Sequence, residues 1–452
     1  MLLPTPRLLH AAALLIPPLL FGCANVGEPP FAEAAPTATK CPQAVPSTAR
    51  CLAGTDSKGA HYLIAMPADW NGHLLLHAHG GPFLGEATAK RAEEDLTRWA
   101  IAVKAGYAYA GSSFRQGGVE VRAAAEDTER LRRIFRAHVA KPKRTILHGQ
   151  SWGANVAAKG AEMFTASTVG SQPYDAVLLT SGVLAGGTRS YDFRTDLRAV
   201  YQYLCNNHPR PTEAQYPLNI GLPAGAKMVQ ADVAARVDEC LALDKPAAQR
   251  SADQQAKVQT IERVLKIPAS SIQGHMNWAT MHFQDIVEKR TGGASPFGNA
   301  GARYAGSSDD AALNAGVARY RADPAAVRRF AADTDLAGRI PVPVLTTKWI
   351  GDPTAFVELD AHFGETMKKG GSGDRLVQTF TSKGTHSYIS DVTYPVLLDA
   401  LLGWVEQGAK PTAAGIAAAC PAYEARFGAG CSFDASYQPK PLESRVVARE
   451  RP

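Results

Sequence analysis

Residues 149–153 read Gly149-Gln150-Ser151-Trp152-Gly153 and separate two segments of different periodicity. Residues 144–148 are β-prone, whereas apolar side chains between residues 151 and 164 repeat at helical spacing. A G-x-S-x-G pattern between a strand and a helix predicts a sharp turn that holds its serine in a strained backbone conformation. Side chains at positions 149 and 153 would collide with the neighbouring strand and helix, which explains both glycines. The pattern is short enough to arise by chance, but this context favours Ser151 as a nucleophile.

A glycine-rich loop follows the apolar segment 73–78 and reads His79-Gly80-Gly81-Pro82. Such a loop can supply a backbone N–H group to an oxyanion hole, which stabilises a negatively charged reaction intermediate. Pro82 has no N–H group, so we predict Gly81 as one donor. We expect the second donor to be the N–H group of Trp152, directly after the nucleophile. A plain tight turn is the alternative interpretation of the glycine pair.

Two further side chains of catalytic type follow strand-like segments later in the chain. Asp352 follows the segment 341–347, and His386 follows the segment 375–380. Active-site groups gather at the carboxyl ends of parallel strands, so we expect both side chains near Ser151. An imidazole can take the proton of a serine, and a carboxylate can orient that imidazole. The sequence therefore predicts a catalytic triad in the chain order Ser, Asp, His.

Other acids and histidines are weaker candidates. Glu358 and Asp360 are lower-ranked choices for the acid, because we expect them on the following helix and facing away from Ser151. His77 and His148 lie in strand-like segments and are expected to pack rather than react. His275 and His282 lie in an insertion, where nothing in the sequence distinguishes them.

The order of the remaining segments predicts an α/β architecture. Strand-like segments at 107–110 and 175–180 alternate with helical ones near 121–139 and 394–407. This alternation favours a mostly parallel central sheet flanked by helices. Residues 187–337 interrupt the pattern with helical stretches, and we predict a cap that covers the site, with a separate domain as the alternative. The expected parts are a core of residues 41–186 and 338–410, the cap at 187–337, and a C-terminal extension with a disulfide at 411–452.

The N-terminal residues predict export. Residues 1–22 contain Arg7, an apolar run and then small residues, which is typical of a secretory signal peptide. Residues 20–23 resemble a bacterial lipobox, so we predict lipidation of Cys23 and a membrane-anchored lipoprotein, with plain secretion as the alternative. Residues 23–40 are rich in Ala, Pro and Thr and are expected to be a flexible tether.

The six cysteines beyond Cys23 support export. They cluster in three sequence-local pairs, which favours disulfides and an oxidising compartment. Six unpaired core cysteines are the alternative interpretation. No pair has C-x-x-C spacing, so nothing indicates a zinc site or a redox motif. The favoured pairs are Cys41 with Cys51, Cys205 with Cys240, and Cys420 with Cys431.

The composition excludes several classes of protein. The chain has 452 residues and is 45% hydrophobic, which is incompatible with a disordered chain. Its net charge of +6 is small for this length and lacks basic–aromatic interleaving, so we expect no nucleic-acid partner. Outside the N-terminus no apolar run is long enough to span a bilayer. We therefore expect contact with a membrane through the lipid on Cys23 alone.

With these motifs, the chain resembles the α/β-hydrolase superfamily over nearly all of residues 60–410. The loop at residues 79–82 and the Ser-Trp-Gly of residues 151–153 are similar to the proline iminopeptidase branch, although Gln150 and Phe83 replace glycines of that branch. Residues 67–72 (Pro-Ala-Asp-Trp-Asn-Gly) are similar to secreted bacterial esterases of the same superfamily. The resemblance implies the α/β-hydrolase fold with a largely helical cap.

The expected activity is hydrolysis of a carboxylic ester, of a small molecule or of a polymer, without a metal or organic cofactor. An aminopeptidase or prolyl-type peptidase with the same triad is the first alternative. By resemblance, an enzyme of that type needs cap carboxylates that hold the ammonium group of its substrate. A catalytically silent surface lipoprotein is the second alternative. The cap acids available for an ammonium group include Asp232, Asp238, Glu239 and Glu262.

Overall fold

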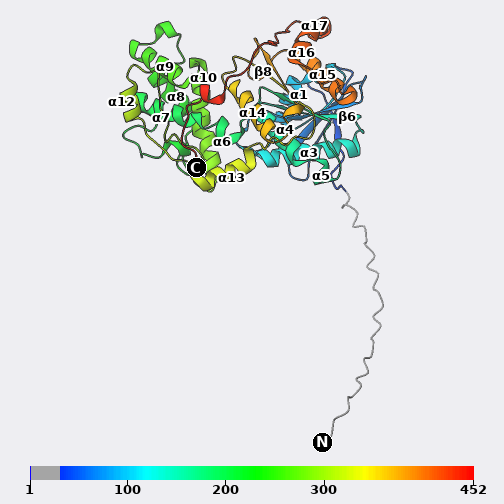
Figure 1. The fold of residues 1–452 in the computed structure, drawn as a ribbon, viewed down its shortest axis with the longest axis horizontal. Helices are drawn as coiled ribbons and strands as arrows, with labels where there is room; N and C mark the ends of the chain where they lie inside the picture. The colour runs from blue at the N-terminus through cyan, green and yellow to red at the C-terminus, as the bar shows by residue number, and fades with distance from the viewer. Residues whose placement is uncertain (2–30) are drawn as a thin grey trace. The chain divides into compact units, whose positions relative to one another are not determined.

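A nine-stranded mixed sheet forms the centre of the protein (Figure 1). The computed structural model describes Met1 and residues 31–452, and every element named below lies in residues 34–452. The strand order is β1-β2-β3-β5-β4-β6-β7-β8-β9, with antiparallel pairs from β1 to β5 and parallel pairs from β5 to β9. The strands are β1 (Thr37–Thr39), β2 (Arg50–Thr55), β3 (His61–Met66), β4 (His73–Ala78), β5 (Ala108–Ser112), β6 (Arg144–Gln150), β7 (Ala176–Thr180), β8 (Val344–Trp349) and β9 (Leu376–Thr381).

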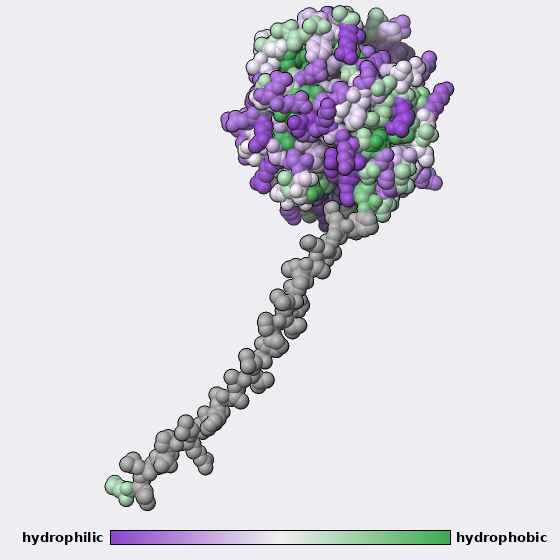
Figure 2. Space-filling model, turned by 90° about the vertical axis from the view of Figure 1, so that its right-hand side faces the viewer, coloured by the Kyte–Doolittle hydropathy of each residue, from purple (hydrophilic) through white to green (hydrophobic). Residues whose placement is uncertain are grey.

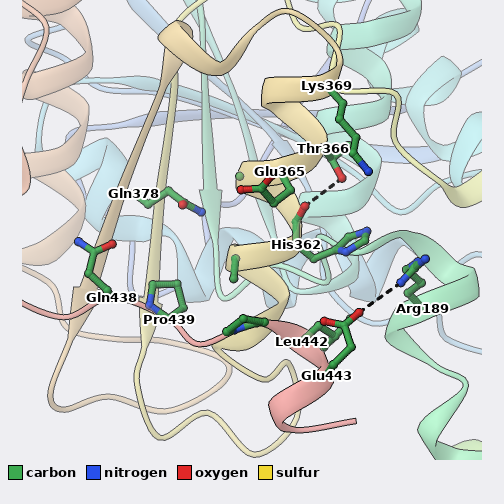
Figure 3. A pocket seen from close by; sticks show the side chains of 13 residues that line it. Arg189, His362, Glu365, Thr366, Lys369, Gln378, Gln438, Pro439, Leu442 and Glu443 are labelled. Carbon is green, nitrogen blue, oxygen red and sulfur yellow. Dashed lines mark hydrogen bonds and ion pairs between the residues drawn. The ribbon is translucent and has the colours of Figure 1, made fainter. Parts of the chain in front are cut away.

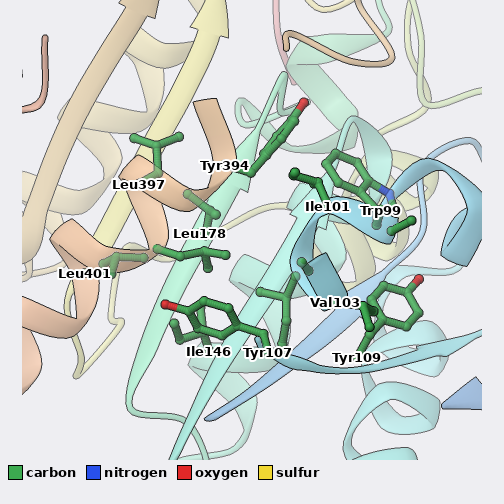
Figure 4. Packing of buried hydrophobic residues seen from close by; sticks show 14 of the residues in the cluster. Trp99, Ile101, Val103, Tyr107, Tyr109, Ile146, Leu178, Tyr394, Leu397 and Leu401 are labelled. Carbon is green, nitrogen blue, oxygen red and sulfur yellow. The ribbon is translucent and has the colours of Figure 1, made fainter. Parts of the chain in front are cut away.

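The central strands β4, β6 and β7 are buried along nearly their whole length, because helices cover both faces of the sheet. On one face, α3 (Val121–His138) and α4 (Trp152–Met163) pack against the strands and against each other. On the other face, α1 (Ala89–Arg98), α2 (Ala100–Lys104) and α15 (Thr393–Gln407) enclose an apolar cluster (Figure 4). In that cluster the rings of Trp99 and Tyr394 meet edge to face, with centroids 4.8 Å apart. The core thus holds the carboxyl ends of the strands in fixed positions.

The chain between β7 and β8 contains helices but no strand within residues 181–343, all of which the structure describes. Helices α7, α8, α9, α10 and α12 of this insertion gather in a lobe beside the sheet, on the left of Figure 1. This is the segment that the sequence predicts as a cap. Its elements are α6 (Gly186–Ser190), α7 (Phe193–Cys205), η1 (Leu218–Ile220), α8 (Gln230–Leu241), η2 (Ala247–Gln249), α9 (Ala252–Leu265), α10 (Ala269–Asn277), η3 (Trp278–His282), α11 (Phe283–Asp285), η4 (Ile286–Arg290), α12 (Asp310–Gly316) and α13 (Pro324–Thr334).

The remaining helices complete the core and the C-terminal extension. They are α5 (Ala166–Val169), α14 (Glu358–Lys369), η5 (Gly373–Arg375), α16 (Ala413–Ala419), α17 (Pro421–Phe427) and η6 (Leu442–Ser444). The architecture combines a mostly parallel sheet between helical layers, a strand–serine–helix turn from β6 to α4, and a helical insertion before β8. These features together are the α/β-hydrolase fold, and the predicted fold class is confirmed.

The six cysteines pair as the sequence favoured. Cys41 bonds Cys51, Cys205 bonds Cys240 and joins α7 to α8, and Cys420 bonds Cys431. Three disulfides indicate a protein of an oxidising compartment outside the cytoplasm.

The N-terminal part of the described chain corrects the predicted tether. The predicted signal peptide and Cys23 lie outside the described residues. The tether was expected at 23–40, but Thr37–Thr39 form β1 and pair with β2, where Thr39 lies opposite Cys51. The adjacent Cys41–Cys51 disulfide holds this strand on the sheet edge. Composition alone suggested flexibility there, whereas backbone hydrogen bonds to β2 order these residues.

The surface is mostly polar on the face that Figure 2 shows, with hydrophobic residues scattered among hydrophilic ones. Among the described residues, no helix combines the length and the apolar composition that crossing a bilayer requires.

Candidate active site

Ser151 occupies the turn between β6 and α4 with φ 57° and ψ −120°. A positive φ is unfavourable for a residue with a side chain, so the surroundings must enforce it. The Ser151 N–H group donates to the carbonyl oxygen of Thr180 on β7 at 2.9 Å. A Cβ atom on Gly149 would lie 2.1 Å from the Gly153 carbonyl oxygen, and one on Gly153 would lie 2.1 Å from the Ala78 carbonyl oxygen. The two glycines therefore allow the close packing of strand, turn and helix.

The structure brings Ser151, His386 and Asp352 together in one hydrogen-bonded chain. Ser151 Oγ lies 2.8 Å from His386 Nε2, and His386 Nδ1 lies 2.8 Å from Asp352 Oδ2. The other carboxylate oxygen of Asp352 accepts hydrogen bonds from the N–H groups of Thr354 (2.8 Å) and Ala355 (2.9 Å). A carboxylate only accepts, so Nδ1 carries the proton and Nε2 is left to accept from the serine hydroxyl. Asp352 is 2% exposed, and its carboxylate is shielded from competing water.

Gln150 links the turn to the loop that carries His386. Its side-chain amide donates to the backbone carbonyl oxygen of His386 at 2.9 Å. Its other amide atom, Oε1, lies 2.1 Å from where a Cβ on Gly80 would be, so Gln150 occupies the space that the glycine leaves free. The sequence marked Gln150 only as a departure from a family pattern. The structure gives it a specific contact that holds the imidazole-bearing loop.

The two predicted oxyanion donors lie at the ends of elements that meet at this turn. Trp152 is the first residue of α4, where helix geometry leaves N–H groups without an acceptor in the helix. Gly81 adopts φ +79°, and its carbonyl oxygen accepts from Phe83 N–H at 2.9 Å across Pro82. The indole of Trp152 is 3% exposed and packs edge to face on Phe114, with centroids 5.6 Å apart.

Two cap histidines bind the loops on either side of the serine. His275 Nε2 donates to the carbonyl oxygen of Pro353, next to Asp352, at 2.9 Å. His282 Nε2 donates to the carbonyl oxygen of Pro82, next to Gly81, at 2.9 Å. The sequence did not distinguish these histidines, although their spacing of seven residues places them on one face of a helix. The segment α10–η3 therefore connects the acid loop to the glycine-rich loop.

The weaker sequence candidates have other partners. Asp360 is fully buried on α14 and forms an ion pair with Lys348. Glu358 pairs with Arg445 of the C-terminal extension, 3.3 Å apart. His77 and His148 hydrogen-bond to each other through their Nδ1 atoms at 2.9 Å. Burial lowers the pKa of His77 to about 3, so this pair is neutral at physiological pH.

The acidic residues of the cap do not gather at the serine. Asp232 and Asp238 accept hydrogen bonds from backbone N–H groups near the ends of their own helix, and Glu262 accepts one from the first residue of α10. Glu239 pairs with Arg210. A buried cation, Arg194 of α7, lies near the two cap histidines: its guanidinium lies over the ring of Trp278, which stacks on His282 with centroids 4.6 Å apart. The sequence carries no signal for Arg194, since nothing in the pattern around it separates it from an ordinary surface arginine of a helix.

Two cavities differ in their relation to this site. One of about 240 Å³ adjoins the glycine-rich loop and is lined by Pro82, Phe83 and Trp152, among others. The other, of about 550 Å³, lies between α14, β9 and the C-terminal extension (Figure 3). Polar side chains such as His362 and Arg189 line it. Ser151, His386 and Asp352 line neither cavity, but the smaller one includes Trp152, the neighbour of Ser151. Among the residues that the structure describes, no group of three metal-binding side chains is arranged to hold an ion.

Comparisons with known proteins give a likeness of fold. No family model matches the sequence, and no curated protein matches it either. Among solved structures, the chain is similar to an esterase from Aspergillus oryzae, with 14% identity over 83% of this chain and 86% of that one and a TM-score of 0.45. It is also similar to feruloyl esterase B from the same organism, with 15% identity over 84% and 88% and a TM-score of 0.45. An esterase from Pyrobaculum calidifontis shares 15% identity over 83% and 85%, with a TM-score of 0.36. At this level of similarity, the activities and substrates of these proteins are not transferred to this chain.

Proposed function

We propose that this protein is an exported serine hydrolase that cleaves carboxylic esters through an acyl-enzyme intermediate. The observation that carries the proposal is the hydrogen-bonded chain from Ser151 through His386 to Asp352, with two contacts of 2.8 Å. A serine hydroxyl is a weak nucleophile by itself and needs a base within hydrogen-bond distance. This arrangement supplies that base at the end of a parallel sheet.

The proposed reaction begins with attack of Ser151 Oγ on the ester carbonyl carbon. His386 Nε2 takes the serine proton and then gives it to the leaving alcohol. Asp352 holds the imidazole in the required tautomer and stabilises its cationic form. In the second half of the reaction, water attacks the acyl-enzyme with His386 again as the base. The carboxylic acid leaves, and Ser151 regains its proton.

The negative charge of each tetrahedral intermediate is proposed to lie against the N–H groups of Gly81 and Trp152. Removing one such donor costs about 3 kcal/mol of transition-state stabilisation in a well-studied protease. The N-terminus of α4 adds to this field, because the aligned peptide dipoles of a helix place partial positive charge at its N-terminus.

Ester hydrolysis is favoured over the peptidase alternative by the charges of the cap. A peptidase that recognises a substrate ammonium group needs unpaired carboxylates at the site. The four cap acids considered for this role have local partners, and the buried Arg194 lies over the ring of Trp278, between the two cap histidines in sequence. A positive charge in that position repels an ammonium group.

The decisive test is substitution of the nucleophile. We expect Ser151→Ala to lower hydrolysis of a short p-nitrophenyl ester by about 10,000-fold or more, because the residual rate then depends on binding and the oxyanion donors alone. The circular dichroism spectrum should not change. An organophosphonate probe should label Ser151 in the wild-type protein, as peptide mass spectrometry would show.

Ser387→Ala is the matched control, since this exposed serine neighbours His386. It should retain both turnover and labelling. Full activity of Ser151→Ala, or labelling at a different residue, would contradict the assignment. Faster cleavage of proline β-naphthylamide than of any ester would favour the peptidase. Failure of all esters and amides together with absence of labelling would favour the catalytically silent lipoprotein.

We further propose that the exported chain carries a lipid on Cys23. The support is the lipobox-like sequence at residues 20–23 and the three disulfides, which fit an oxidising compartment. Mass spectrometry of the mature N-terminus should find a diacylglyceryl-modified cysteine at position 23. An unmodified N-terminus would contradict the anchor and leave plain secretion.

A further inference from the structure

Arg194 is a buried cation held among aromatic rings. It lies in the first turn of α7 and is 3% exposed. Its guanidinium carbon is 4.6 Å from the ring centroids of both Phe193 and Trp278 and 5.4 Å from that of Tyr191. Such contacts with ring faces favour a cation but provide no hydrogen-bond acceptor for its edge.

The donors of Arg194 are largely unused. Nη1 donates to the carbonyl oxygen of Ser190 at 3.3 Å, and the buried Nε has no acceptor. Among the described residues, no carboxylate forms an ion pair with this guanidinium. The two acids nearest in sequence, Asp192 and Asp196, form ion pairs with Arg449 instead, and Asp192 also pairs with Arg451.

Arg198, one turn further along α7, provides the contrast. It is also buried, and its Nε likewise has no acceptor, but its two terminal nitrogens donate to Thr280 Oγ1 at 2.8 Å and to several backbone carbonyl oxygens. Arg198 therefore has the partners of a structural arginine. Burying an arginine without such partners lowers the stability of the free protein. A ligand that accepts hydrogen bonds from the arginine offsets this cost when it binds.

The position of Arg194 relates it to the proposed catalytic serine. Trp278, whose ring it contacts, lies in the segment between His275 and His282. These two histidines bind the carbonyl oxygens of Pro353 and Pro82, in the two loops that flank Ser151. Arg194 therefore lies against the middle of the segment that connects these loops. The positive charge of Arg194 is close enough to contribute to the lowered pKa values of both histidines.

We propose that Arg194 binds a free carboxylate on the ester substrate, so that the preferred substrates are esters that carry one, such as the monoester of a dicarboxylic acid. This inference rests on the proposed ester hydrolysis. A planar guanidinium can donate two parallel hydrogen bonds to a planar carboxylate, and the aromatic rings exclude water from the pair. Burial lowers the pKa of Arg194 to about 9, so the group is cationic at neutral pH.

The test compares esters that differ in one charge. Monoethyl and diethyl esters of succinate, glutarate, adipate and suberate are hydrolysed by the wild-type protein, and kcat/KM is measured by chromatography. For at least one chain length we expect the monoester to be preferred about 10- to 100-fold, which is the range for hydrogen bonds to a charged group. Arg194→Met should abolish this preference, and Arg194→Lys should retain part of it.

Arg189→Met is the matched control. This arginine lies five residues earlier, is partly exposed and pairs with Glu443 at 3.7 Å, so its loss should leave the monoester preference unchanged. Equal rates for monoesters and diesters in the wild type, or an unchanged preference in Arg194→Met, would overturn the inference.

A second measurement does not depend on the folding of a variant. Among succinate, glutarate, adipate and suberate, the free dicarboxylate whose monoester is preferred should inhibit wild-type hydrolysis of a neutral p-nitrophenyl ester competitively. The diamide of the same chain length, which lacks the charge, should not. Equal inhibition by the two compounds, or none by either, would overturn the carboxylate site while neutral ester hydrolysis persists. Failure of the proposed function is distinguishable, because then no ester is hydrolysed and the phosphonate does not label Ser151.

Discussion

At the scale of single residues, the site depends on positions where a side chain would not fit. Ser151 keeps a strained backbone because the elements around it pack too closely to relax. A Cβ on Gly153 would lie 2.1 Å from the Ala78 carbonyl oxygen and 2.4 Å from that of His79. Both contacts are with backbone atoms, which cannot rotate away as the end of a side chain can.

We therefore expect Gly153→Ala to lower the unfolding free energy by about 3 kcal/mol, because α4 must move away from the sheet. Urea denaturation measures this change. Gly160→Ala in the same helix is the control, since its nearest contact would be an ordinary 3.5 Å. Alanine there should raise stability by about 1 kcal/mol through helix propensity. A Gly153→Ala variant as stable as the wild type would contradict the steric argument.

At the scale of elements, α10 and η3 act as one connector. Their histidines lie seven residues apart and bind the acid loop and the glycine-rich loop. His275 is 3% exposed and lies near the positive charge of Arg194. Burial, with the charge of Arg194 added, lowers the pKa of His275 to about 3 from its usual 6.5. The connector therefore requires a neutral imidazole.

This lowered pKa predicts a pH dependence of stability. Below pH 6.5 the unfolded chain binds a proton at His275 that the folded chain does not bind, so its contribution to stability is lost as the pH falls from 6.5 toward 3. His275→Gln keeps an N–H donor for Pro353 but cannot titrate. Between pH 7.5 and 5.5, the variant should lose about 1 kcal/mol less unfolding free energy than the wild type. Urea titrations at both pH values measure this difference, and identical losses would show that His275 accepts a proton in the fold.

At the scale of the whole molecule, the C-terminal extension joins the sheet to the helical insertion. Phe433 pairs with Thr381 at the edge of β9, and further on Arg449 reaches the start of α7. There Arg449 forms ion pairs with Asp192 and Asp196, and all three side chains are nearly inaccessible to water. Burial raises the pKa of Asp196 to about 6, although the Arg449 charge opposes this shift. Removing the arginine leaves buried carboxylates with one cation fewer.

We expect Arg449→Met to lower the unfolding free energy by about 3 to 5 kcal/mol, because a buried charge loses its partner. The control is Arg321→Met, since Arg321 pairs with Glu450 of the same segment on the exposed surface. That substitution should cost about 1 kcal/mol or less. Both values come from urea denaturation of the full chain. Equal losses of unfolding free energy in the two variants would mean that the buried contact of Arg449 with α7 does not stabilise the fold more than a surface ion pair does.

The three side chains of the proposed triad could be predicted because their signals are local. Gly149 and Gly153 reflect a steric requirement that arises within the five residues around Ser151. Asp352 and His386 each follow a strand closely. Gln150, Arg194 and the two cap histidines had no such signal. The hydrogen-bond partners of Gln150 and of the two cap histidines lie 78 to 236 residues away, and Arg194 contacts the ring of Trp278. These contacts depend on how distant parts of the chain pack together.

The amino-acid sequence by itself determined the α/β class, the turn around Ser151 and the pairing of six cysteines, because short-range sterics and hydrophobic periodicity act along the chain. The tertiary structure decided what faces the serine: which loops the cap histidines bind, which acids have partners, and that a buried arginine lacks one. It also placed residues 37–39 on the sheet rather than in a tether. These outcomes depend on which distant surfaces meet during folding, and burial changes the energetics of a charged group only after they have met.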